Sequence, residues 1–139
     1  MAEFIFKKMI LDAGVEDMFE VYSSATSSEE IYRGVGNPIY PPAKRELGKH
    51  GVPYENRRAV QLKFDDYELY DMFVGMDSAN IRNMHALFGG DRDKKIFKLL
   101  EFTLRGGDVS DPWYSDRFDV AFDDISDGCK ALLQRLSSM

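Results

Sequence analysis

Apolar side chains recur at steps of three and four residues through the last part of the chain. They are Phe118, Phe122, Ile125, Cys129, Leu132, Leu133 and Leu136. This spacing puts all of them on one stripe of a helix, so it predicts a long amphipathic α-helix. A stripe of this kind has to be buried against other elements of the fold, which limits what the rest of the chain can be.

Helices and strands are predicted to alternate ahead of this last helix. Residues 1–13, PPAKRELGKHG and DSANIRNMHALFGG predict helices, each ended by glycine, and Asp77 or Ser78 is the expected N-cap of the third. The stretches DMFVGM and KIFKLLEF predict strands, and MFEVYSSATS predicts a strand that runs into a Ser/Thr loop. This order is typical of an α/β protein in which helices cover both faces of a small parallel sheet, a three-layer αβα fold.

Length and charge narrow the class of protein. The chain has 139 residues and no linker or repeat, so we expect a single domain over residues 1–139. The net charge of -6 argues against a nucleic-acid partner, because such binding needs clustered Lys and Arg. No apolar run approaches the roughly 20 residues that a membrane span needs, and MAEFIFKKMI lacks the features of a signal peptide.

Cysteine and histidine usage gives two further expectations. Cys129 is the only cysteine, which excludes an internal disulfide and suits a reducing compartment, so we expect a cytoplasmic protein. His50 and His85 show no ligand spacing with each other or with Cys129. We therefore expect no metal site and structural or solvated roles for both histidines.

The stretch DVSDPWYSD follows the predicted strand KIFKLLEF, and so lies where α/β sheets bind ligands, at the carboxyl ends of their strands. Asp111 is followed there by Pro112, Trp113 and Tyr114. The residues alone leave two interpretations open. Asp111 is either a turn residue with Trp113 in the core and Tyr114 capping a helix, or an acid beside a slot for a flat substrate.

Four stretches carry a resemblance to a known family. MAEFIFKKMI, EVYSSATS, FVGMDSANIRNM and DVSDPWY resemble, in this order, the first helix, the Ser-Ala-Gly-Thr-Ser strand end, the Met-Asp-x-x-Asn helix start and the Asp-Pro-Tyr-Tyr loop of low-molecular-weight protein tyrosine phosphatases of Gram-positive bacteria. The resemblance covers essentially the whole chain. It implies hydrolysis of phosphotyrosine monoesters through a cysteinyl-phosphate, without a cofactor, on a phosphotyrosine-containing protein or a small aryl phosphate.

The resemblance also assigns expected roles to individual residues. Asp111 would be the general acid that protonates the tyrosyl oxygen and then activates water. Trp113 and Tyr114 would wall the slot for the phosphotyrosine ring, because flat rings favour stacked or edge contacts. Ser23 would support the family's phosphate loop by hydrogen bonding.

The family's phosphate loop, C-x5-R-S/T-P, has no match in this chain. That loop supplies a thiolate nucleophile, a cradle of backbone N–H groups and an arginine for the phosphate oxygens. Cys129 lies on the apolar stripe of the last helix with Arg135 six residues on, so we expect it to be structural. We therefore expect an N-terminally truncated domain that lacks the inner, first strand of the family's four-stranded sheet, is inactive by itself and exposes a sheet edge for self-association.

The chain departs from the family pattern at further positions, and other interpretations of its function remain open. Tyr40-Pro41-Pro42 stands where the family has Asp-Pro-Arg, and Glu29 where it has a rim aromatic. The acidic run DVAFDDISD is expected to be the solvated face of the last helix. The alternative function is a non-catalytic phosphatase-like binding or regulatory domain. A flavodoxin-like cofactor binder is disfavoured because no Gly-rich phosphate loop follows a predicted strand.

Overall fold

The computed structural model describes residues 1–27, 31–32, 35–36 and 38–138. Its α-helices are α1 (Ala2–Asp12), α2 (Pro41–Lys49), α3 (Ser78–Phe88), α4 (Pro112–Ser115) and α5 (Phe118–Ser137). Its 3-10 helices are η1 (Glu16–Met18), η3 (Phe64–Glu68) and η4 (Leu99–Phe102). Its strands are β1 (Ile31–Tyr32), β2 (Val35–Gly36), β3 (Phe73–Gly75) and β4 (Ile96–Lys98).

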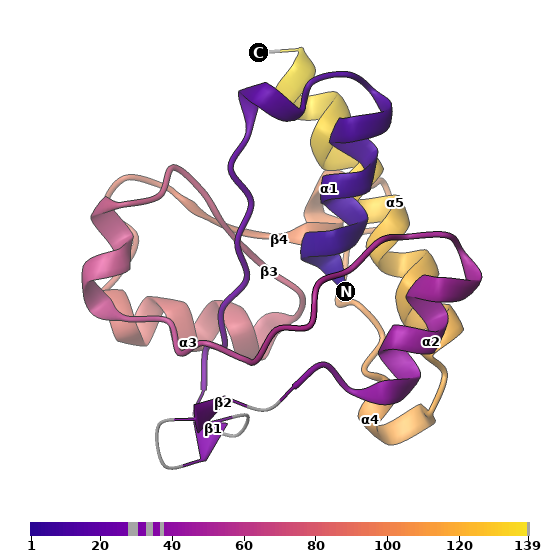
Figure 1. Cartoon of the computed structure of the whole chain (residues 1–139). Coiled ribbons are helices and arrows are strands. Elements are labelled where there is room, and N and C mark those ends of the chain that lie inside the picture. The colour runs from indigo at the N-terminus through magenta and orange to yellow at the C-terminus, as the bar shows by residue number, and fades with distance from the viewer. Residues whose placement is uncertain (28–30, 33–34, 37, 139) are drawn as a thin grey trace.

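The central sheet is small and parallel. β3 pairs with β4 in the register Phe73 to Ile96, and the short β1–β2 pair is antiparallel and separate from it. Successive residues of β3 face opposite sides: Phe73 is in a cluster with Met84 of α3, whereas Val74 packs on the cluster built by α1 and α5. Helices therefore cover both faces of the sheet (Figure 1), as the α/β prediction requires.

The larger core lies between α1, α5 and η4. Its largest fully buried side chains outside α2 are Leu99, Leu100 and Cys129, each at most 1% exposed. The periodic stripe on α5 predicted this burial, and Phe122, Ile125, Cys129 and Leu132 are all buried in the same cluster. Burial at this level is worth about 1.5–3 kcal/mol for each large aliphatic side chain, which is what holds the two helices together.

Local signals in the sequence explain the helix boundaries. The Asp77 side chain accepts a hydrogen bond from the Asn80 backbone N–H at 2.8 Å, which makes Asp77 the N-cap of α3, as predicted. Gly89 ends the helix at φ 70°, a left-handed conformation that glycine adopts without steric cost. Pro41 and Pro42 occupy the first positions of α2, where no intrahelical N–H is needed.

The strand predicted in MFEVYSSATS, residues 18–27, is wrong. The structure has η1 up to Met18 and then extended chain, with only an isolated parallel bridge between Ala25 and Gln61. Ala25 donates its N–H to Val60 and accepts from Leu62, and this short pairing ends there. β-branched and aromatic residues favour an extended backbone, but a strand also needs a neighbour along its length.

The strand predicted in KIFKLLEF is correct in place but too long. β4 ends at Lys98 and the chain turns at once into η4, where Leu99 and Leu100 point into the core. No helix in the described part of the chain is long and apolar enough to cross a membrane.

Candidate active site

The loop of residues 103–111 joins η4 to α4 and carries Asp111 as its last residue. It follows β4 and η4, so it lies at the carboxyl end of the parallel sheet, where ligands of α/β proteins bind. Asp111 is exposed and directly precedes the single turn of α4, which is closed by a 2.8 Å hydrogen bond from the Asp116 N–H to the Pro112 carbonyl. The structure therefore puts Asp111 on the surface at the end of the sheet that sequence reasoning indicated.

The two aromatic residues after Pro112 lie within α4. The side chains of Trp113 and Tyr114 lie outside what the structure describes, as does Glu29, so their expected roles as slot and rim residues stay predictions. Ser115 donates its hydroxyl to the Asp111 carbonyl at 3.3 Å, which ties the end of this turn back to its beginning.

The carboxyl ends of both strands hold the middle of the 103–111 loop. Asp108 accepts hydrogen bonds from the backbone N–H and hydroxyl of Ser78, both at 3.2 Å, and pairs with the Lys98 ammonium at 2.8 Å. The Lys98 ammonium, helped by Ser78, lowers the pKa of Asp108 below its ordinary value. The next residue, Val109, is buried and donates its N–H to the Met76 carbonyl at 2.9 Å.

A buried carboxylate on α5 holds the residue just before Asp111. Asp124 is 8% exposed; it accepts from the Ser110 N–H at 2.9 Å and pairs with Arg105 at 2.9 Å. The acidic run DVAFDDISD was predicted to be solvated, and at Asp124 that prediction is wrong. Asp124 lies three residues after Ala121 and four before Gly128, so it shares one side of the helix with two small residues that are buried. This spacing is the signal that could have revealed the burial of Asp124.

A second polar network joins the end of β3 and the start of α3 to Thr26. Asn80 accepts from the Met76 N–H at 2.9 Å and donates to the Thr26 hydroxyl at 3.2 Å. Asn83 donates to the same hydroxyl at 3.3 Å. Thr26 therefore fastens the extended segment that follows Ser23 to the first turns of α3, a role that the sequence did not indicate.

Ser23 contacts the first turn of α1. Its hydroxyl donates to Glu3 at 2.8 Å, and the Glu3 side chain, only 2% exposed, also pairs with Arg57 at 2.9 Å and with Lys7 at 2.5 Å. Sequence reasoning missed Glu3, because a glutamate in a first helical turn is usually exposed. The expected support of a phosphate loop by Ser23 stays a prediction.

Cys129 lies in the core between α1 and α5, 1% exposed. Burial raises the pKa of its thiol to about 12, so the thiolate that a nucleophile requires does not form near neutral pH. His50 likewise has a packing contact: its ring stacks on Phe122 with 3.8 Å between centroids and lies 3.2 Å from Glu46.

We expect Cys129 in the folded chain to react with iodoacetamide about 10³-fold more slowly at pH near 8 than in the unfolded chain, because its thiolate fraction is lower by that factor. Mass spectrometry of timed aliquots, with and without guanidinium chloride, measures the ratio. Equal rates in a protein shown to be folded by circular dichroism would contradict the burial of this thiol.

Comparison with known proteins agrees with this arrangement. The family model for low molecular weight phosphotyrosine protein phosphatase matches residues 1–139. The low molecular weight protein-tyrosine-phosphatase PtpA of Staphylococcus aureus (strain MRSA252) is 28% identical over 134 residues, which cover 96% of this chain and 82% of PtpA.

Solved structures share the fold. The crystal structure of YfkJ from Bacillus subtilis superposes with a TM-score of 0.90 at 25% identity, over 99% of this chain and 85% of YfkJ. SP-PTP, a low molecular weight protein tyrosine phosphatase from Streptococcus pyogenes, superposes with a TM-score of 0.83 at 30% identity, over 97% of this chain and 82% of SP-PTP. The resemblance found in the sequence is thereby confirmed, and the chain belongs to the low molecular weight phosphotyrosine protein phosphatase family.

Proposed function

We propose that this chain supplies the general-acid half of a protein tyrosine phosphatase site and does not hydrolyse phosphotyrosine by itself. The observation that carries the proposal is the position of Asp111. It is exposed at the end of a loop whose preceding residues, Asp108, Val109 and Ser110, are all held by hydrogen bonds to strand ends and to α5. The backbone that carries this exposed residue is therefore held in place, as a positioned proton donor requires.

The proposed chemistry is proton transfer at the leaving group. When a thiolate attacks phosphorus, the bond to the aryl oxygen breaks and its electron pair stays on that oxygen. Asp111 gives its proton to this oxygen, so the tyrosine leaves as a neutral phenol. The Asp111 carboxylate then takes a proton from the water that attacks the phosphocysteine, which releases phosphate and restores the thiolate.

This chain contains no thiolate for the first step. Its single cysteine is the buried Cys129, and no C-x5-R sequence occurs in it. A positioned acid contributes about 10²- to 10⁴-fold. Enzymes accelerate phosphate-monoester hydrolysis by up to about 10²¹-fold. The acid alone therefore leaves nearly all of the barrier in place.

The experiment is a sensitive assay of the purified chain with p-nitrophenyl phosphate, beside a protein-free blank and the Asp111→Asn variant. We expect all three to give the same rate. Turnover above the blank that disappears in Asp111→Asn would overturn the proposal. Circular dichroism of both proteins establishes that the comparison is made between folded chains.

Trp113 and Tyr114 are proposed to wall the aryl slot, and Ser23 to support a phosphate loop placed against α1. The substrate class is a phosphotyrosine-containing protein or a small aryl phosphate, in the cytoplasm. The open edge of β3, which pairs only with β4 among the described residues, is the proposed place for self-association.

The second candidate is a non-catalytic phosphatase-like domain that binds a partner and regulates it. The same observation favours it: a well-held acid loop in a chain whose one thiol is inert. This second candidate predicts that Asp111→Asn leaves partner binding unchanged. The first candidate predicts instead that phosphatase activity depends on Asp111 as soon as a nucleophile is supplied.

A further inference from the structure

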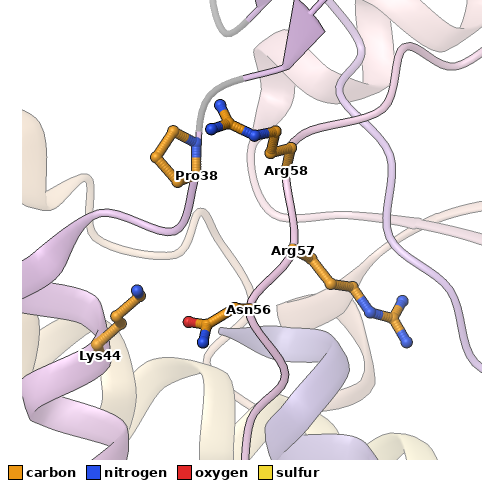
Figure 2. Close-up of a pocket in the computed structure, with 5 residues that line it drawn as sticks. All are labelled: Pro38, Lys44, Asn56, Arg57 and Arg58. Atoms are coloured by element: carbon orange, nitrogen blue, oxygen red, sulfur yellow. The ribbon is translucent and has the colours of Figure 1, made fainter.

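A cavity of about 260 Å³ lies between the segment that enters α2, α2 itself and the segment of residues 56–58 (Figure 2). It is lined by Pro38, Lys44, Asn56, Arg57 and Arg58. Three of these residues are cationic and none is acidic, although the whole chain has 24 acidic and 18 basic residues. The cavity is therefore a local positive site on an acidic protein.

Arg57 is already neutralised by carboxylates. Its guanidinium pairs with Glu3 and with Glu55, each at 2.9 Å. The Glu55 carboxylate raises the pKa of Arg57 further, and Figure 2 shows the guanidinium turned away from Lys44. Arg57 thus serves mainly to fix the backbone that carries its two neighbours.

Lys44 and Arg58 have positive charges that no carboxylate of the described residues compensates. Arg58 donates to the Gly36 carbonyl at 3.1 Å, a neutral acceptor. Neither residue has an ion pair with any carboxylate in the described ranges of the chain. The Asn56 side chain, directed toward Lys44 in Figure 2, adds a neutral amide group, with two N–H donors, beside Lys44.

The walls of the cavity are held in place without a ligand. The backbone of Pro38 forms an antiparallel bridge with that of Arg58, which joins two of the walls. Lys44 lies in the first turns of α2 beside the buried Ala43, which fixes the side of the helix from which it projects. A preformed cavity of this size suits a group smaller than a drug-sized ligand.

We propose that this cavity binds one compact oxyanion of the phosphate or carboxylate class, held by Lys44, Arg58 and the Asn56 amide. The cavity is near the chain that follows α4. The ring of Tyr40, which lies between Pro38 and Lys44 in the sequence, packs on the ring of Phe118, the first residue of α5, with 5.7 Å between ring centroids. An anion in the cavity therefore lies on the same side of the molecule as the chain that follows Asp111. The source is either a free anion or an acidic side chain of a peptide.

The experiment is a titration of the ¹⁵N-labelled chain with inorganic phosphate at constant ionic strength, followed by NMR. We expect saturable shifts of the Lys44, Asn56 and Arg58 amides with a Kd on the order of 1 mM. Lys44→Met should weaken binding by about tenfold or more, because a charged hydrogen bond is lost. The matched control is Arg45→Met, which removes the same charge from the next residue of α2, an exposed residue outside the lining.

Equal weakening by the two variants would overturn the proposal, since it would mean that only the general charge of the surface matters. Absence of saturable shifts at these amides with both phosphate and the acidic peptide described next would overturn it as well. A second arm compares an aspartate-rich peptide with its asparagine counterpart. Lys44-dependent binding of the acidic peptide alone identifies a peptide source, and Lys44-dependent binding of phosphate without peptide binding identifies a free anion; both support the site.

Discussion

Extending the chain at Met1 by an apolar strand and a C-x5-R-S-P loop of the family pattern is expected to produce a phosphatase that depends on Asp111. In that extended protein Asp111→Asn should lower kcat for an aryl phosphate by about 10²- to 10⁴-fold, the contribution of a positioned proton donor. A joined loop would run directly into α1, whose first residue is Ala2, and the backbone N–H groups of a helix start favour bound phosphate. Stopped-flow or steady-state measurement of p-nitrophenol release gives both rates.

The matched control is Asp116→Asn. Asp116 is an exposed carboxylate at the other end of α4, and its φ of 56° is a conformation that asparagine tolerates well. We expect this variant to keep activity within about twofold, since it leaves the proposed proton donor in place. Equal losses in both variants would mean that the negative charge of the loop, and not proton transfer by Asp111, supports the reaction.

The extension would change the ionisation of the first residue before α1. Burial lowers the pKa of the Met1 α-amino group, because a charged ammonium is poorly solvated there. In the extended protein this group becomes a neutral peptide N–H, so the joining removes a charge from a buried position. A folded but inactive extended protein would contradict the proposed role of the chain as the acid half of a site.

Helices were predictable from the sequence because their signals are local. The stripe from Phe118 to Leu136, the Asp77 cap and the glycine at position 89 act within a few residues, and each corresponds to an observed boundary or buried face. The strand predicted in residues 18–27 was wrong because a strand is defined by a neighbouring strand. The local pattern of side chains cannot reveal whether such a neighbour is present.

The position of Asp111 in the fold could be predicted from the sequence, but the hydrogen bonds that hold the surrounding loops could not. Asp111 follows a predicted strand, and that order alone places it at the carboxyl end of the sheet. The hydrogen bond from Ser110 to Asp124 joins residues 14 apart, and the one from Asn80 to Thr26 joins residues 54 apart. Such pairs form only when tertiary packing brings two elements together. The spacing on α5 indicates that Asp124 is buried, but it does not reveal which residue Asp124 binds.

Gly128→Ala is expected to destabilise the chain by about 2 kcal/mol, although alanine is the better helix former by about 1 kcal/mol. An added Cβ would lie 2.4 Å from the Leu99 Cγ and 2.9 Å from its Cδ2, and Leu99, only 1% exposed, has no free space to enter. The contact matters for function because Leu99 begins η4, which leads into the 103–111 loop. Urea unfolding followed by circular dichroism measures the change in the free energy of unfolding.

Gly48→Ala is the opposite case and the control. Gly48 lies in α2, where an added Cβ meets nothing within 4 Å, so the same substitution should stabilise the chain by about 0.5–1 kcal/mol.

When Gly128→Ala is combined with Leu99→Ala, the space vacated by leucine admits the methyl group added at position 128. The two losses should therefore sum to about 1–2 kcal/mol more than the loss of the double variant. Strict additivity would show that positions 128 and 99 do not compete for the same space. The packing of η4 against α5 would then depend on other contacts.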